Sequence, residues 1–125
     1  TLEEKGYLPV IAPIGTDAEG NGYNINADLA AAEIAKALKA DKLIYITDTD
    51  GVKLHGKYVT TLKTADIAKN IKNGQITGGM IPKLNSAKET VASGVKKVHI
   101  INGTKEHSML LEIFTKEGTG TEIVK

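Results

Sequence analysis

Short runs rich in branched apolar residues alternate with segments of helical periodicity along most of this chain. The runs at 42–47 and 98–101 each follow a segment, 26–40 or 80–93, in which Ala, Leu, Ile and Val recur at helical spacing. A strand, a helix and a second strand in this order form a parallel crossover unit. The sequence therefore predicts an α/β fold, a three-layer αβα sandwich with a mainly parallel sheet.

Turn residues and local patterns predict the remaining elements. Residues 8–14 are apolar on both alternating faces, which is typical of a strand buried between helices. Turn formers at 16–22 predict a hairpin or an exposed loop. The further expected elements are a small hairpin at 52–59, a helix of about eight residues capped by Thr64 and ending near 73–74, a helix at 107–115 and a strand at 121–124.

The helix expected at 26–40 has a clear start and an apolar face. Asn26 is a favoured N-cap residue, because its side-chain oxygen can accept hydrogen bonds from backbone N–H groups of the first turn. The apolar spacing indicates an inward stripe formed by Leu29, Ala32, Ile34, Ala37 and Leu38.

Size and charge restrict the class of protein. The 125 residues fit one domain, 1–125, and the formal net charge of +1 leaves no basic field for nucleic acid and no polybasic patch for a membrane. No apolar run reaches the roughly 20 residues that span a bilayer, and the chain does not open on a signal-peptide pattern. The absence of Cys fits an intracellular protein. We expect a soluble, cytoplasmic protein. Its composition is compatible with binding of a small anionic ligand.

Ligands of open α/β sheets bind outside the carboxyl ends of the strands. We therefore expect the turns after Ile14, Thr47 and Ile101 to gather at one edge of the sheet. Residues 75–79 can join them as a glycine-rich entry to a helix, where backbone N–H groups and the helix dipole favour phosphate oxygens. No Gly-Lys-Ser or Gly-Lys-Thr follows, so this is not the Walker pattern, and an ordinary tight turn is the alternative.

Two turn-to-helix junctions each place a charged side chain in a first helical turn. Residues 23–28 end at Asp28, and residues 78–83 end at Lys83. A carboxylate and a lysine beside a glycine-rich loop suit phosphoryl transfer, which depends on positioning and on compensating oxygen charge. The alternatives are a charge that only stabilises the helix terminus for Asp28 and a surface lysine for Lys83.

Four motifs in this order carry a family resemblance: VIAPIG at 10–15, NINAD at 24–28, TDTDGV at 47–52 and ITGGMIPK at 76–83. Across essentially all of its residues the chain resembles the carboxyl-terminal, nucleotide-binding half of the N-acetyl-L-glutamate kinases, members of the amino acid kinase family. The resemblance implies the carbamate kinase-like fold of that family.

The resemblance also implies a reaction and a set of site residues. The γ-phosphoryl group of ATP would pass to the side-chain carboxylate of N-acetyl-L-glutamate in arginine biosynthesis, with Mg²⁺ bridging phosphate oxygens and no direct protein ligand. Asn24 would hold the acylated amino acid, Asp28 would organise the catalytic lysines, and Lys83 would stabilise the transferring group. The residues implied in ATP or ADP binding are Asp48, Thr49, Asp50, Gly51, Val52, Lys53, Gln75, Ile76, Thr77 and Gly79.

The family's amino-terminal half, with its second catalytic lysine and most of the acylglutamate pocket, has no counterpart here. Residues 1–6 resemble the last turn of a helix ended by Gly6, so we expect a piece of a longer protein, with a frayed natural terminus as the alternative. The resemblance implies that the parent protein is a homo-oligomer and that this piece binds ATP or ADP but is inactive by itself. One alternative is a stand-alone nucleotide-binding or regulatory module. Another is half of a related kinase acting on acetylaminoadipate, carbamate or glutamate.

Residues 107–121 resemble the segment with which arginine-inhibited members of the family bind L-arginine. Glu112 would pair with the guanidinium, and the region of Gly118 would offer backbone carbonyls. An amphipathic helix ended by a glycine is the alternative. The three His residues are far apart and lack metal-ligand spacing, and His99 is expected to be an ordinary strand residue.

Overall fold

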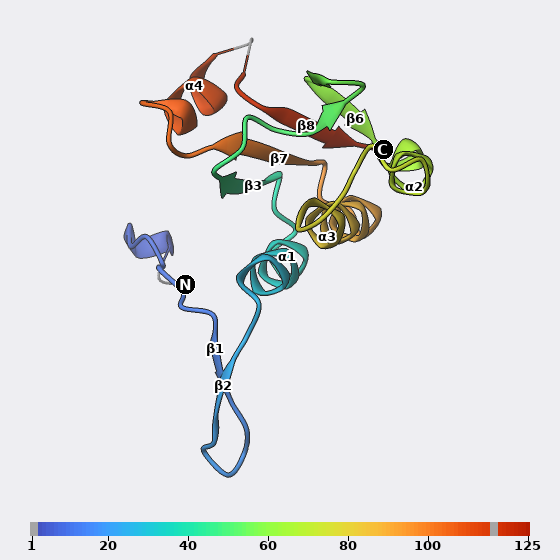
Figure 1. Cartoon of the computed structure of the whole chain (residues 1–125). Helices are drawn as coiled ribbons and strands as arrows, with labels where there is room; N and C mark the ends of the chain where they lie inside the picture. The colour runs from blue at the N-terminus through green and yellow to red at the C-terminus, as the bar shows by residue number, and fades with distance from the viewer. Residues whose placement is uncertain (1–2, 116–117) are drawn as a thin grey trace.

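The computed structural model describes residues 3–115 and 118–125 (Figure 1). Its helices are α1 (Ala27–Ala37), α2 (Thr64–Lys72), α3 (Met80–Ala92) and α4 (Ser108–Phe114), after a 3₁₀ turn at Glu3–Lys5. The strands are β1 (Ile14–Thr16), β2 (Gly22–Asn24), β3 (Lys42–Thr47), β4 (Lys53–Leu54), β5 (Lys57–Tyr58), β6 (Thr61–Lys63), β7 (Lys97–Asn102) and β8 (Thr121–Val124). No helix in the described part of the chain is long and apolar enough to cross a membrane.

Four strands form the central sheet in the order β3-β7-β8-β6. β3 pairs with β7 in parallel from Lys42 opposite Lys97 to Thr47 opposite Asn102, and β6 also pairs with β8 in parallel. The pairing of β7 with β8 is antiparallel. The sheet is thus mainly parallel, as expected, with one reversal between its two halves.

Helices lie on both sides of this sheet. α1, α2 and α3 lie on one side, where α3 packs against both α1 and α2, whereas α4 lies on the opposite side against β7 (Figure 1). Side chains alternate along β7, so Val98 and Ile100 join the core beneath α3 while His99 faces the side of α4. This arrangement confirms the αβα layering that the sequence predicts.

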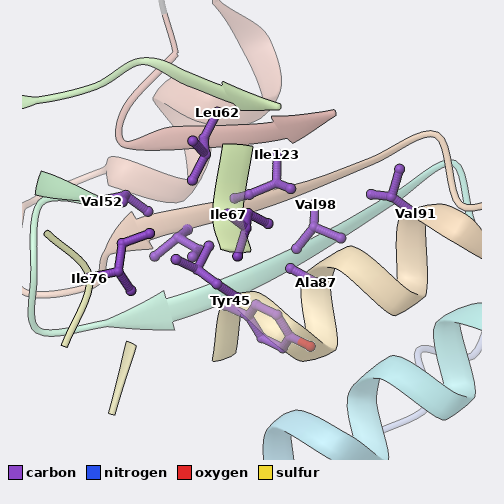
Figure 2. Close-up of a cluster of buried hydrophobic side chains, with 11 residues drawn as sticks. Tyr45, Val52, Leu62, Ile67, Ile76, Ala87, Val91, Val98 and Ile123 are labelled. Carbon is purple, nitrogen blue, oxygen red and sulfur yellow. The ribbon is translucent and has the colours of Figure 1, made fainter. Parts of the chain in front are cut away.

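The core lies between the sheet and helices α2 and α3 (Figure 2). It consists of Tyr45, Val52, Leu62, Ile67, Ile76, Leu84, Ala87, Val91, Val98, Ile100 and Ile123. Val52 and Ile76 belong to loops rather than to helices or long strands, yet both are buried. Their burial anchors the two loops at 48–52 and 75–79 to the sheet, and these are the loops in which the sequence predicts ligand binding.

Most expected elements are confirmed, with ends shifted by at most three residues. Asn26 is the N-cap of α1, and its Oδ1 accepts from the backbone N–H groups of Asp28 (3.0 Å) and Leu29 (3.2 Å). Both expected hairpins are present, as β1–β2 and β4–β5. Of residues 1–6, those from Glu3 onward form a helical turn that ends at Gly6 with φ of +79°, and residues 1–2 lie outside the described part.

The strand predicted at 8–14 is wrong. Only Ile14 of this run is in a strand, the short β1 that pairs with β2, and the hairpin points away from the sheet (Figure 1). Leu8 is 88% exposed and Val10 is 93% exposed. A strand exists only where a neighbour accepts and donates its backbone hydrogen bonds, and Pro9 and Pro13 each lack a donor. The turn after Ile14 therefore does not join those after β3 and β7.

Two details of the helices also differ from expectation. The inward face of α1 is formed by Ala32 and Ala35, while Leu29, Ala37 and Leu38 are exposed. Alanines at most positions make several faces apolar, so periodicity does not single one out. Thr64 is the first residue of α2 rather than its cap, because β6, which the sequence analysis missed, runs directly into the helix through Lys63.

Candidate functional site

The first turns of α1 and α3 bring Asp28 and Lys83 together. The Lys83 ammonium lies 2.6 Å from Oδ2 of Asp28, and the two side chains are 15% and 35% exposed. The capping hydrogen bonds of Asn26 fix the first turn of α1, and Lys83 lies one turn into α3. Two residues 55 positions apart in sequence thus form a partly buried ion pair between adjacent helices.

Tyr45 of β3 lies beneath this ion pair. The Lys83 ammonium sits 4.7 Å from the centroid of its ring, a cation–π contact. The phenol hydroxyl donates to the backbone carbonyl of Asp28 (3.1 Å) and is also hydrogen-bonded to Oγ of Ser86 (3.1 Å). Sequence analysis assigned Tyr45 only to an apolar strand, since no local pattern marks a contact between β3 and the first turn of α1.

A cavity of about 230 Å³ lies at the carboxyl end of β3. It is bounded by the turn after β3, the β4–β5 hairpin and the loop that leads into α3. Its lining comprises Thr49, Gly51, Val52, Lys53, Tyr58, Gln75, Ile76, Thr77 and Met80. Seven of these are among the residues that the family resemblance implies in nucleotide binding, although they come from two segments far apart in sequence.

One hydroxyl shapes the turn that borders this cavity. Thr121 Oγ1 accepts from the Val52 backbone N–H (2.8 Å) and donates to the Val59 carbonyl (2.5 Å). Gly51 has φ of +127°, and a Cβ there would lie 2.5 Å from the same hydroxyl oxygen. Only glycine fits this close approach. The start of β8 therefore clamps both ends of the hairpin segment.

Two further polar groups border the cavity. The side-chain oxygen of Gln75 accepts from the backbone N–H of His55 (2.8 Å), which ties the loop before α3 to the β4–β5 hairpin. Thr49 lines the cavity, and its buried hydroxyl has no hydrogen-bond partner within the described residues. Because a buried polar group without a partner is costly, this hydroxyl is suited to contact a polar ligand.

Asp48, Asp50 and Gly79, also implied in nucleotide binding, do not line the cavity. Asp50 instead accepts from the amide of Asn102 (2.7 Å) and contacts the Lys105 ammonium at 2.8 Å. The hydrogen bond from Lys105, and then that from Asn102, lower the pKa of the Asp50 carboxyl. This link joins the turns after β3 and β7, as expected for the ligand edge. Sequence analysis missed Asn102 and Lys105, although both follow a strand that ends at that edge.

Asn24 lies apart from the cavity. It is the last residue of β2, opposite Ile14 in the hairpin, and its side chain is exposed. One residue, Ile25, separates it from the N-cap Asn26, so the chain continues directly into the turn that carries Asp28. Asn24 thus lies near Asp28 in sequence, but no contact joins it to Asp28 or Lys83 among the described interactions.

A larger cavity of about 550 Å³ lies on the α4 side of the sheet. Its lining comprises Lys42, Thr60, Thr61, Lys97, His99, Glu112, Ile113, Thr115, Gly118, Thr119, Gly120 and Glu122. Glu112 and Gly118 are the two residues that the sequence analysis associated with arginine, and residues 116–117 of that segment lie outside the described part. The cavity also includes Lys42, His99 and Glu122, which the sequence analysis did not assign to a site.

Charged groups meet at Glu112 of α4, which is buried. One of its oxygens contacts Nδ1 of His99 and lies 3.8 Å from the Lys42 ammonium, and the other accepts from the Thr119 backbone N–H at 2.8 Å. His99 is a strand residue, as expected, but it lies between Glu112 and Glu122, whose Oε2 is 3.3 Å from Nε2. Burial lowers the pKa of His99, against the opposite effect of Glu112.

The comparisons with known proteins agree on one family. The model of the amino acid kinase family matches residues 1–102. Acetylglutamate kinase of Chlorobaculum tepidum is 58% identical over 123 residues, which are 98% of this chain and 43% of that relative. Acetylglutamate kinase of Aquifex aeolicus is 55% identical over 124 residues, 98% of this chain and 42% of that relative. The chain spans less than half the length of the curated relatives it matches.

Solved structures give the same fold. N-acetylglutamate synthase from Neisseria gonorrhoeae, complexed with coenzyme A and L-arginine, matches with a TM-score of 0.85 and 32% identity, over 92% of this chain and 27% of that one. Carbamate kinase from Giardia lamblia, bound to AMP-PNP, matches with a TM-score of 0.68 over 90% of this chain and 41% of that one. At 24% identity, the second likeness is evidence for the fold alone.

Proposed function

The chain belongs to the amino acid kinase family, and from this premise we propose that it is the nucleotide-binding half of an acetylglutamate kinase. In that role the γ-phosphoryl group of ATP passes to the side-chain carboxylate of N-acetyl-L-glutamate, a step of arginine biosynthesis. ATP would enter with its magnesium ion, which would have no direct protein ligand and would offset charge on the phosphate oxygens. A cytoplasmic location accompanies this proposal.

The observation that carries the proposal is the 230 Å³ cavity at the carboxyl end of β3. Seven nucleotide-binding candidates from two separate segments line it, at the edge of the sheet where α/β proteins bind ligands. Lys53 offers a cationic group, the hydroxyl of Thr49 is unpartnered, and Met80 brings the amino end of α3 to the rim. Backbone N–H groups at a helix start favour phosphate oxygens.

Lys83 and Asp28 suit the transfer step in this proposal. Lys83 is three residues beyond Met80 on the same face of α3, so the residue lies about one helical turn from the one that reaches the cavity. There it would offset charge on the transferring phosphoryl oxygens, and Asp28 would hold it in place. Asn24 would contact the acylated amino acid beyond the start of α1.

Two lysines on one hairpin test nucleotide binding. Lys53 lines the cavity, whereas Lys57 does not. Calorimetric titration with ATP and Mg²⁺ should give saturable binding to the wild-type chain. Lys53→Met should weaken it by about tenfold, the loss of roughly 1.4 kcal/mol for one charged contact, and Lys57→Met should change it little. Absence of saturation at millimolar ATP, or equal losses in both variants, would contradict the proposal.

A second pair tests the role of Lys83. Lys88 is an exposed lysine of the same helix, so Lys88→Met removes the same charge at a distance from the ion pair. We expect Lys83→Met to reduce the phosphate-dependent part of binding, measured as the difference in affinity between ATP and adenosine. Lys88→Met should retain that difference. If the two variants kept or lost this affinity difference to the same extent, the proposal that Lys83 contacts the phosphates would be wrong.

By itself the chain should bind ATP without turnover, since more than half of each curated relative has no counterpart in it. Losing one preorganised charge-stabilising group typically costs about 10²–10³-fold in rate. Trapping of acyl phosphate with hydroxylamine should show no product from the chain, ATP, Mg²⁺ and N-acetylglutamate. Adding the remaining segment of a relative in trans should restore product. Turnover by the chain alone would refute the inactivity that we propose.

The same assay separates the alternatives. A stand-alone nucleotide-binding or regulatory module would bind ATP but remain inactive with the added segment. Half of a related kinase would form product from acetylaminoadipate, carbamate or glutamate instead of N-acetylglutamate. Sedimentation of the reassembled protein would test the further proposal that the parent enzyme is a homo-oligomer.

A second candidate function is binding of L-arginine in the 550 Å³ cavity. The solved synthase complexed with L-arginine shares the fold at 32% identity. Two carboxylates, Glu112 and Glu122, face this cavity, and a planar guanidinium pairs well with carboxylates. In the proposed complex the arginine guanidinium takes the position near Glu112 that Lys42 approaches to 3.8 Å.

Amide NMR tests this site directly. Titration with L-arginine should shift the signals of Glu112, Gly118 and Thr119, and Glu112→Gln should remove the response. Glu106→Gln, which neutralises an exposed carboxylate just before α4, is the control and should keep it. A response equal for L-arginine and L-lysine, or one retained by Glu112→Gln, would contradict a guanidinium site.

A further inference from the structure

Tyr45 has no role in the function proposed above. It is 4% exposed and belongs to the core on one side of its ring, packed with Ala87 and the other buried residues beneath α3. Its hydroxyl, however, is directed out of the apolar cluster, toward the side of α1 (Figure 2). The side chain of Tyr45 therefore packs in the core with one part of its surface and contacts the Asp28–Lys83 pair with its hydroxyl and ring face.

The hydrogen bonds of the Tyr45 hydroxyl have a fixed direction. A phenol has one proton, and the Asp28 backbone carbonyl can only accept, so the proton of Tyr45 goes to Asp28 (3.1 Å). Ser86 must then donate its own proton to the phenol oxygen (3.1 Å). The chain of donors runs from α3 through β3 to the first turn of α1. Burial raises the pKa of Tyr45, and the nearby Asp28 charge adds to the rise, so the phenol keeps the proton that this chain requires.

The ring of Tyr45 acts on the other partner. The Lys83 ammonium lies 4.7 Å from the ring centroid while it contacts Asp28 at 2.6 Å. A lysine side chain has four rotatable bonds, and either contact alone would leave several of its rotamers accessible. With a ring face beneath it and a carboxylate beside it, the ammonium is confined to one place at the amino end of α3.

We infer that Tyr45 is a positioning residue that sets both members of the Asp28–Lys83 pair, Asp28 through its backbone carbonyl and Lys83 through the face of the ring. The inference rests on the proposed function in one respect: the placement of Asp28 and Lys83 matters for activity only if the pair takes part in phosphoryl transfer, which depends on how accurately charged groups are placed. Ser86 assists by orienting the phenol.

The two contacts of Tyr45 can be separated by substitution. Tyr45→Phe keeps the ring and removes the hydroxyl, Tyr45→Leu removes both, and Ser86→Ala removes only the donor to the phenol. In each variant the charges of Asp28 and Lys83 are unchanged. Tyr23→Phe is the control, because it deletes a tyrosine hydroxyl of the exposed β1–β2 hairpin.

NMR of the intact chain with ¹³C-labelled lysine gives the deciding measurement. Methylene groups over an aromatic face resonate upfield, so the ε-CH₂ of Lys83 should lie upfield of that of Lys88. Tyr45→Phe and Ser86→Ala should keep this shift and move the backbone amides of Asp28 and Leu29. Tyr45→Leu should abolish the shift, and Tyr23→Phe should leave every one of these signals in place.

The wild-type spectrum alone can overturn the inference, even if Tyr45→Leu fails to fold. A Lys83 ε-CH₂ signal at the position of Lys88 would show that the ring does not hold the ammonium. Unchanged Asp28 and Leu29 amides in Tyr45→Phe would show that the hydroxyl does not hold the turn.

ATP titration connects the geometry to binding. If the Tyr45→Leu variant folds, its affinity for ATP should be about tenfold lower than that of the wild type. Tyr45→Phe should lower the affinity by a smaller factor. Failure of the proposed function has a different signature: the wild-type chain would not bind ATP while the Lys83 shift responded as described. Unimpaired ATP binding by a Tyr45→Leu variant that has lost the shift would refute the positioning role.

Discussion

At the scale of single residues, the two charged clusters of this protein differ in how they are solvated. The Asp28–Lys83 pair is partly exposed and each partner has one opposite charge. On the other face of the sheet, His99 is buried among Glu112, Glu122, Lys42 and Lys97, so its protonation depends on four charges from four elements. The second cluster is therefore the one whose state should follow pH.

The stability of the chain should depend on pH through His99. Burial lowers its pKa in the folded state below the ordinary 6.5, so the unfolded state takes up the proton first as pH falls. The contribution of neutral His99 to the free energy of unfolding is fully present above about pH 6.5, the pKa in the unfolded state. It decreases as pH falls below that value and levels off only below the lowered pKa of the folded state. Urea denaturation at about pH 7.5 and about pH 5.5 should show lower stability at the acidic value.

Substitutions identify the group responsible. His99→Gln should flatten the pH dependence of unfolding in this window, whereas His55→Gln, which changes an exposed histidine, should retain it. Wild-type stability that stays level or rises on acidification would show that Glu112 and Glu122 outweigh burial and hold His99 in its charged form.

Sequence patterns locate some residues of the site and cannot locate others. Asp28, Lys83 and Gln75 each stand in a recognisable turn next to a helix start, and the structure brings them to the expected edge or into the expected pair. Tyr45 and Asn102 have no such local mark. Their roles come from contacts with residues 17 and 52 positions away, which depend on how strands and helices pack.

At the scale of elements, the 230 Å³ cavity is held in shape by a strand that contributes no residue to its lining. Thr121 begins β8, and its hydroxyl joins the Val52 N–H to the Val59 carbonyl on either side of the β4–β5 hairpin. Next to it, Gly120 has φ of +104°, and a Cβ there would lie 2.1 Å from the Ile100 carbonyl. The close approach of β8 to β7 thus sets where the hairpin sits.

Removal of the Thr121 hydroxyl should destabilise the chain. Thr121→Val keeps the shape of the side chain but leaves the buried N–H of Val52 without an acceptor, at a cost of about 1–3 kcal/mol. The measurement is the free energy of unfolding in urea. Thr121→Ser, which retains the hydroxyl, should lose clearly less. A valine variant as stable as the wild type would show that water replaces the hydroxyl and that the clamp is not structural.

Elements were predicted best where a pattern is both long and self-contained. Helices α1 and α3 and strands β3 and β7 each have a clear periodicity of their own, and their ends lie within three residues of expectation. Strand β6 has three residues and exists because β8 pairs with it. The run at 8–14 has the composition of a buried strand, but only Ile14 pairs with another strand and that strand is outside the central sheet, so composition alone misleads there.

At the scale of the whole molecule, the segment before α1 carries several exposed apolar side chains. Leu8, Val10, Ile11 and Ile14 are all more than 60% exposed, and β3 is an edge of the four-stranded sheet in the described structure. An unpaired strand edge and exposed apolar residues both favour association with other chains.

The antiparallel pairing of β7 with β8 could not be predicted from the sequence, because the order of elements along the chain does not give the position or direction of each strand in the sheet.

The chain should therefore self-associate in a concentration-dependent way. Sedimentation velocity over a range of concentrations should show a rising average mass, and Val10→Lys combined with Ile11→Lys should reduce it. Ala68→Lys combined with Asn85→Lys adds the same charge at exposed positions of α2 and α3 and should leave association nearly unchanged. A single monomeric species at the highest concentration would count against this expectation.

The burial of one tyrosine gives this protein its own optical probe. The chain has four Tyr and no Trp, and Tyr7, Tyr23 and Tyr58 are 51–64% exposed while Tyr45 is 4% exposed. On unfolding, only Tyr45 passes from an apolar environment into water, because the other three rings are largely hydrated already. The near-ultraviolet difference absorbance of unlabelled protein therefore reports on the ring that contacts Lys83.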